Sequence, residues 1–177
     1  MTQKRPQKGD YAEFYEKYIA LVPSGDFLTI LEEQRKDLLG LLSGLSEQQA
    51  DHRYAPDKWS IKEVIGHIND AERIFGYRLL RIARGDQTPL ASFEQEPYIQ
   101  TGKFSSRNLT DLLAEFSAIR EATITLTRSL DDAAWLRRGT ASQKEITATA
   151  LAFIIVGHAR HHRNLIAERY LPDRAHA

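Results

Sequence analysis

The hydrophobic residues of this 177-residue chain recur mostly at intervals of three and four, and the alternation that marks strands is scarce. This spacing is typical of helices that bury one face. It predicts long helices over about residues 26–43, 60–85, 110–130 and 147–170, and a short one within 11–21. We therefore expect an all-α protein, an antiparallel four-helix bundle with a short extra N-terminal helix.

Local signals agree with these boundaries. Asp26 is a suitable N-cap for the first long helix. Ser60 and Glu63 form a capping-box pattern at the start of the second, and Gly85 is placed to end it. The connection from Gly85 to Asn108 is long for a compact bundle, which is typical of crossovers, lids and binding loops. We expect a long crossover loop there.

Three histidines are the candidate chemistry of the chain. His158 and His162 are one helical turn apart, so their side chains lie about 40° and roughly 6 Å apart along one helix face. That face is also the apolar stripe of the last helix, whereas His67 lies at the edge of the apolar arc of the second. Because bundles place metal sites where facing helices meet, the three imidazoles are candidates for one transition-metal site.

Each of these residues also has a plainer interpretation. The run Arg160–Arg163 can be a solvated basic face near a helix C-terminus, where cations are favoured. His67 can be a hydrogen-bonded histidine at a helix interface. We interpret Glu72, Arg73 and Arg78 as structural charges.

Composition narrows the function classes. Lys plus Arg and Asp plus Glu both number 24, so there is no basic field, and we expect no nucleic-acid or membrane partner. The absence of cysteine excludes disulfides, thiolate ligands and cysteine nucleophiles. Met1–Tyr11 is polar and lacks an apolar signal region, and no later apolar run is long enough to span a bilayer. We expect one cytoplasmic domain over residues 1–177, with 1–10 as a flexible tail.

Two segments resemble signatures of a known family, the DinB-like superfamily of proposed metalloenzymes. The first is the run YAPDKWSIKEVIGH over Tyr54–His67, continued by Asp70–Arg73 and Tyr77-Arg78; the second is Gly157-His158 followed by His161-His162. The similarity extends from about Tyr18 to Tyr170. The resemblance implies a four-helix bundle, often dimeric, in which one histidine of the second helix and two of the last bind a divalent metal. By position, these are His67, His158 and His162.

The resemblance also implies a range of reactions. Characterised relatives include thiol transferases that use bacillithiol or mycothiol, an isomerase of maleylpyruvate and hydrolases. This chain departs from relatives that place Glu after the first histidine of the last-helix motif, because it has Ala159. Asp70, one turn after His67, is a candidate to orient that imidazole, and equally a candidate for a solvated carboxylate that pairs with a nearby arginine. We expect His161 to support the site or lie at the surface rather than ligate.

Three neutral imidazoles leave a coordination position open, which is typical of catalytic rather than closed structural metal sites. The ion, which the sequence leaves open among Zn, Ni, Co, Mn and Fe, would activate water or a low-molecular-weight thiol cosubstrate. We therefore predict a metal-dependent hydrolase or thiol transferase that acts on a small molecule bound near the 85–108 loop, and the resemblance implies that it is a homodimer. The alternative is a non-catalytic, stress-related binding or dimerisation protein with a structural or vestigial metal site.

Overall fold

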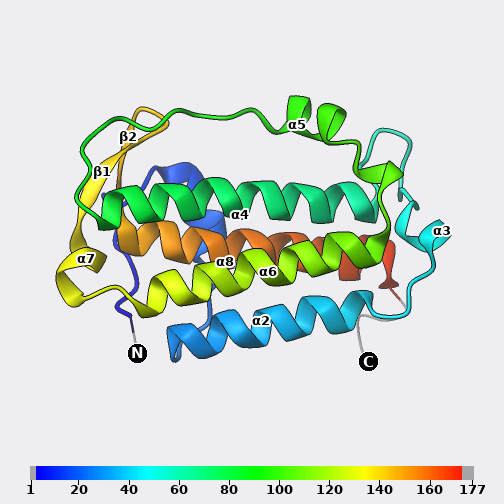
Figure 1. Cartoon of the computed structure of the whole chain (residues 1–177), viewed down its shortest axis with the longest axis horizontal. Coiled ribbons are helices and arrows are strands. Elements are labelled where there is room, and N and C mark those ends of the chain that lie inside the picture. The colour runs from blue at the N-terminus through cyan, green and yellow to red at the C-terminus, as the bar shows by residue number, and fades with distance from the viewer. Residues whose placement is uncertain (1–2, 173–177) are drawn as a thin grey trace.

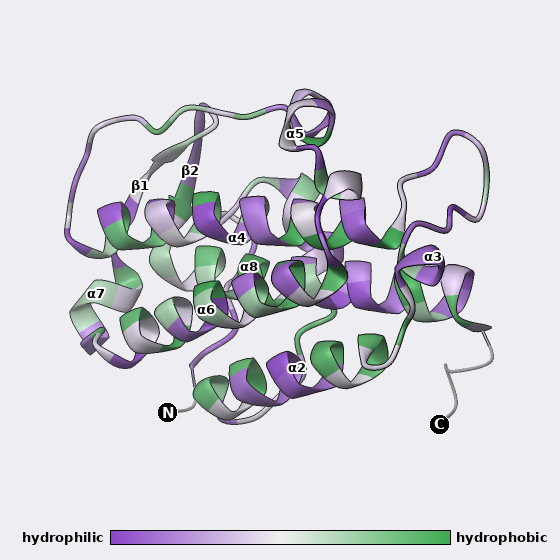
Figure 2. Ribbon diagram, turned by 45° about the vertical axis from the view of Figure 1, so that its right-hand side comes forward, coloured by the Kyte–Doolittle hydropathy of each residue, from purple (hydrophilic) through white to green (hydrophobic). Residues whose placement is uncertain are grey.

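The computed structural model describes residues 3–172 and contains the predicted bundle. Its long helices are α2 (Phe27–Leu42), α4 (Ile61–Ala83), α6 (Leu109–Arg128) and α8 (Ala148–Leu165), with α8 continued by a π-helical turn, η3 (Ile166–Tyr170). They lie side by side along the long axis of the molecule (Figure 1). Hydrophilic and hydrophobic residues alternate along each of them, as amphipathic helices require (Figure 2). The predicted fold class is confirmed.

The helices begin where their capping residues stand. Asp26 accepts a hydrogen bond from the Thr29 amide at 3.0 Å. At the start of α4 the Ser60 hydroxyl accepts from the Glu63 amide and the Glu63 carboxylate accepts from the Ser60 amide, which is the predicted capping box. Gly85, just past the end of α4, has a φ of +81°, a conformation that favours glycine.

The long connection between α4 and α6 is a crossover. It runs back along the bundle, so α4 and α6 begin at the same end and run in the same direction, while α2 and α8 run the opposite way (Figure 1). The connection contains two elements that the sequence did not predict as helices, α5 (Gln95–Gly102) and the 3-10 turn η2 (Phe104–Ser106). Both contact α4.

Further short elements were also not predicted. They are α3 (Glu47–Ala50), α7 (Asp132–Leu136) and an antiparallel hairpin of β1 (Arg138–Ala141) and β2 (Lys144–Thr147), in the register Arg138↔Thr147 to Ala141↔Lys144. The predicted short N-terminal helix is a 3-10 turn, η1 (Glu13–Tyr15), followed by α1 (Glu16–Ile19). The hairpin turn, Ser142 and Gln143, lacks the Asn-Gly or Asp-Gly pair that usually identifies such turns from sequence.

Residues that precede η1 also contact the rest of the chain. The Arg5 guanidinium donates to the carbonyls of Ile19 and Val22, and the Asp10 carbonyl accepts from the Thr147 amide at 3.0 Å. The flexibility predicted for residues 1–10 stays a prediction. No helix within residues 3–172 combines the length and the apolar character needed to cross a bilayer.

A buried polar network ties the long helices together at the centre of the bundle. Arg120 of α6, which is fully buried, donates two hydrogen bonds of 2.8 Å to the carboxylate of Glu72 on α4. Arg120 also donates to Gln34 of α2, whose amide donates to the Val156 carbonyl of α8 at 2.8 Å. This network fixes α4 and α8 relative to each other, and these two helices carry the three histidines.

Candidate metal centre

The structure brings His67, His158 and His162 together in the interior of the bundle. One ligand-type nitrogen from each ring lies within 4.8 Å of the others, and Nε2 of His67 is 3.0 Å from Nε2 of His158. The three side chains are buried, with exposed fractions of 4, 6 and 8%. All three are therefore positioned to contact one small ion.

Two glycines, each directly before a histidine, explain how the cluster is covered. At Gly157 a Cβ atom would lie 2.0 Å from the Tyr18 carbonyl oxygen, so only glycine lets α1 lie directly on α8. At Gly66 a Cβ would lie 2.3 Å from the ring of Phe104 in the crossover. Tyr18 thereby approaches His158, with 5.3 Å between ring centroids. The Tyr18 ring therefore covers one side of His158.

Burial keeps the imidazoles neutral. It lowers the pKa of His67 to about 4, with a smaller contribution from His161. Burial also lowers the pKa of both His158 and His162 well below the usual value, and the neighbouring histidines add to the effect. At neutral pH each ring therefore keeps a lone pair available for a metal.

The donor set fits a transition metal. Nδ1 of His162 is buried and has no hydrogen-bond partner among residues 3–172, an unusual cost for a folded interior unless another group binds in the cluster. Imidazole nitrogens suit Zn and its first-row neighbours, whereas Mg and Ca prefer oxygen ligands. Ala159 is buried beside the motif and supplies no carboxylate.

The two residues predicted to support the site lie as follows. Asp70 is partly buried on α4, and its carboxylate is 3.9 Å from the Arg73 guanidinium; burial raises its pKa. Within residues 3–172, it makes no hydrogen bond to His67. The ring of His161 lies 5.0 Å from that of His162 and 5.5 Å from that of Tyr18, measured between centroids. The roles predicted for Asp70 and His161 stay predictions.

A cavity of about 360 Å³ opens onto the histidine cluster. His67 and His158 line it, and aromatic residues form much of its wall: Phe14, Tyr15, Tyr18, Phe75 and Phe93. Arg78 of α4 and Ser142 of the hairpin turn also line it, with Glu94, Gln95 and Glu96 of the crossover. The cavity is large enough for a small organic molecule in contact with the cluster.

Sequence analysis missed Arg78 and Ser142 as residues of this cavity. Arg78 is 11 residues after His67, which places it about 20° away on the helical wheel, so this spacing could have identified it. Ser142 reaches the cavity through the hairpin, which left no comparable signal in the sequence.

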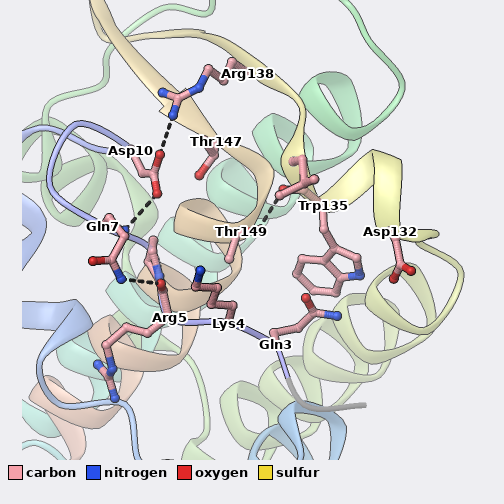
Figure 3. A pocket seen from close by; sticks show the side chains of 12 residues that line it. Gln3, Lys4, Arg5, Gln7, Asp10, Asp132, Trp135, Arg138, Thr147 and Thr149 are labelled. Carbon is pink, nitrogen blue, oxygen red and sulfur yellow. Dashed lines mark hydrogen bonds and ion pairs between the residues drawn. The ribbon is translucent and has the colours of Figure 1, made fainter.

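Another cavity, of about 420 Å³, lies where the N-terminal segment passes α7 and the hairpin (Figure 3). Trp135, Thr149, Arg138 and Asp10 are among the residues that line it, and no histidine of the described chain does. It therefore lacks the metal-ligating set, and we place the candidate site at the three histidines.

Comparison with known proteins identifies the fold and the family of the chain. A solved structure, described as "YfiT from Bacillus subtilis is a probable metal-dependent hydrolase with an unusual four-helix bundle topology", matches with a TM-score of 0.75 and 20% identity. The match covers 98% of this chain and 94% of that one. At this identity the likeness shows a shared fold. Comparison with curated proteins gave no match.

The sequence profile of the DinB superfamily matches residues 30–166, which include all three histidines and the elements that carry them. The chain belongs to the DinB superfamily.

Proposed function

We propose that this protein is a metal-dependent enzyme in which His67, His158 and His162 hold one divalent transition metal. The observation that carries the proposal is a cluster of three buried, neutral imidazoles, two of which, His67 and His158, line a cavity large enough for a small substrate. Three protein ligands leave a position for water or substrate, which favours catalysis over a purely structural role.

When bound, a divalent metal supplies Lewis acidity, which acidifies water or stabilises a thiolate. The chain's own contribution is to hold the ligands and exclude bulk solvent. Tyr18 and Phe75 pack on His158, with ring centroids 5.3 and 5.7 Å away, and Trp59 packs on His67 at 5.0 Å. These aromatic neighbours fix the rings and lower the local polarity, which strengthens electrostatic interactions with a substrate.

The leading reaction class is hydrolysis of a small molecule, in line with the description of the YfiT neighbour. Transfer of a low-molecular-weight thiol is the second candidate, and one observation favours it. Ala159 is where many relatives have Glu, so the last helix supplies no carboxylate to accept a proton from water. A thiolate needs no such base, because it is already the nucleophile.

Elemental analysis by plasma mass spectrometry tests the metal site directly. We expect about one transition-metal ion per chain in untagged protein, and loss of most of it in the alanine variants of His67, His158 and His162. His161→Ala is the matched control, because His161 neighbours the cluster without belonging to it. Wild-type protein that neither contains a metal nor takes up Zn, Ni, Co, Mn or Fe would contradict the proposal.

Activity screening then separates the two reaction classes. Metal-loaded protein is assayed with ester and amide substrates, and with electrophiles in the presence of bacillithiol, mycothiol or no thiol. Turnover that requires the thiol supports transfer, and turnover without it supports hydrolysis. No turnover, together with a large loss of melting temperature on chelation, favours the alternative of a structural metal in a non-catalytic protein.

We also propose that the protein forms a homodimer through the groove between α4 and α6. This groove, of about 620 Å³, is lined mostly by small and apolar residues, among them the exposed Tyr77 and Leu80. Light scattering at micromolar concentration is expected to give twice the monomer mass, and Leu80→Arg is expected to halve it. A wild-type monomer under these conditions would be incompatible with the dimer.

A further inference from the structure

Arg78 is a buried cation without an acidic partner. Its exposed fraction is 3%, and no carboxylate within residues 3–172 lies at ion-pair distance from its guanidinium. Arg120, the other fully enclosed arginine on these helices, is bound by both oxygens of Glu72. Because an unpaired buried charge is costly, the positive charge of Arg78 calls for a functional explanation.

Only one nitrogen of the Arg78 guanidinium is hydrogen-bonded to the surrounding residues in the described chain. Its Nη2 donates to the Ala91 carbonyl and to Ser142 Oγ, at 3.2 Å for the latter. Within residues 3–172, Nε and Nη1 make no hydrogen bond. The group is therefore anchored by one nitrogen, with N–H donors left for a ligand.

The anchor itself is a constrained piece of backbone. Ser142 and its neighbour Gln143 have φ values of 51° and 63°, which residues other than glycine rarely adopt. The Ser142 amide donates to the Leu90 carbonyl at 3.0 Å, and the Leu90 amide donates to the Thr140 carbonyl at 2.9 Å. The hairpin turn and the start of the crossover are thus joined, and together they present the two oxygens that Arg78 contacts. Such strain is more often found at binding sites than elsewhere.

Arg78 and the histidine cluster share one cavity. His67 and Arg78 lie on the same face of α4, about 16 Å apart along its axis, and both line the cavity. The Phe75 ring lies between the histidine cluster and Arg78. Its centroid is 5.7 Å from that of the His158 ring and 5.9 Å from the guanidinium carbon of Arg78. One end of a ligand in this cavity would contact the histidine cluster, and its other end would contact the Arg78 guanidinium. The middle of the ligand would lie against aromatic side chains.

We propose that Arg78 binds a carboxylate of the substrate, so that the substrate is a small monocarboxylate with an apolar spacer and its reacting group near the histidines. The position of the reacting group rests on the proposed function. A planar guanidinium matches a carboxylate with two parallel hydrogen bonds. The rim residues Glu94 and Glu96 are acidic, and Arg78 is the one arginine or lysine among the described lining residues. This balance favours a single negative charge over a phosphate dianion.

The test is an NMR titration of the full-length protein, stripped of metal with chelator, with hexanoate and with its neutral counterpart hexanamide. We expect saturable binding of hexanoate that shifts the Nε–Hε resonance of Arg78, and at least about tenfold weaker binding of hexanamide. Arg78→Met is expected to weaken hexanoate about tenfold or more and to leave hexanamide unchanged. Arg73→Met is the matched control, because Arg73 is a half-exposed arginine of the same helix outside this cavity.

Arg78→Lys guards against a variant that does not fold, since it keeps the charge but not the planar fork, and it is expected to bind hexanoate with an intermediate loss. Equal binding of hexanoate and hexanamide, or hexanoate binding unaffected in both Arg78 variants, would overturn the proposal. Tighter binding of hexyl phosphate than of hexanoate would overturn the carboxylate assignment. Because no metal is present, these results do not depend on whether the histidines hold an ion.

Discussion

The bundle encloses two polar clusters that differ in how they offset the cost of removing polar groups from water. In the network of Arg120, Glu72 and Gln34, charges are paired and donors meet acceptors. In the cluster of His67, His158 and His162, the rings are neutral, no carboxylate accompanies them, and one nitrogen has no described partner. The first cluster is satisfied by partners within the chain, whereas the second has room in its hydrogen bonding for the metal proposed above.

Removal of one partner from the paired network has the largest expected effect. Glu72→Ala leaves the Arg120 guanidinium buried and unpaired, which is expected to lower the free energy of unfolding by about 3–5 kcal/mol. Urea denaturation followed by circular dichroism measures it. Glu121→Ala, which breaks an exposed ion pair with Arg35, is the control and is expected to cost less than about 1 kcal/mol. A loss of similar size in both variants would mean that the buried ion pair contributes no more to stability than the exposed one.

Acid is expected to weaken the metal-free protein through the histidines. The folded-state pKa of His67, about 4, lies below its unfolded value, so the unfolded chain takes up the proton first as the pH falls. Stability is therefore full above about pH 6.5 and falls as the pH decreases toward 4, by on the order of 3 kcal/mol for this residue alone. Urea midpoints measured across this range on wild type and His67→Phe should show a shallower decline in the variant. An identical decline in both would contradict the assignment.

Metal binding is expected to stabilise the histidine cluster. An ion present at about one hundred times its dissociation constant adds about 2.7 kcal/mol to the free energy of unfolding. Melting curves with and without Zn should show the gain in wild type and in His161→Ala, and no gain in His158→Ala. A gain that persists in His158→Ala would locate the ion elsewhere.

Alanine substitutions at two glycines are expected to change the free energy of unfolding by the smallest amounts, and in opposite directions. Gly157→Ala forces a methyl group against the Tyr18 backbone and is expected to cost about 1–3 kcal/mol and to weaken the cover over His158. Gly40→Ala, on α2 with open space around it, is expected to stabilise the protein by about 0.5–1 kcal/mol. Thermal melts of both variants measure whether each substitution lowers or raises the melting temperature. Stabilisation of both variants would show that helix propensity, not the approach of α1 to α8, determines the effect.

The sequence was most informative where periodicity and capping act locally. Ser60 and Glu63 predicted the start of α4, and the spacing of His158 and His162 placed both rings on the core-facing side of α8. The chain's pattern could not reveal that Ser142 reaches Arg78, because that contact depends on a hairpin of four-residue strands with no standard turn residues. Arg78 was interpreted as a structural charge, since only the three-dimensional structure shows that no carboxylate pairs with it.

The crossover between α4 and α6 has a consequence for the order of events during synthesis. His67 and His158 face each other across 91 positions of sequence, and the intervening chain includes the crossover, α6, α7 and the hairpin. An ion that needs both residues cannot be retained while the last helix is still inside the ribosome. Under the proposed function, metal acquisition is therefore a late step, open to competition among the ions present when the finished chain folds.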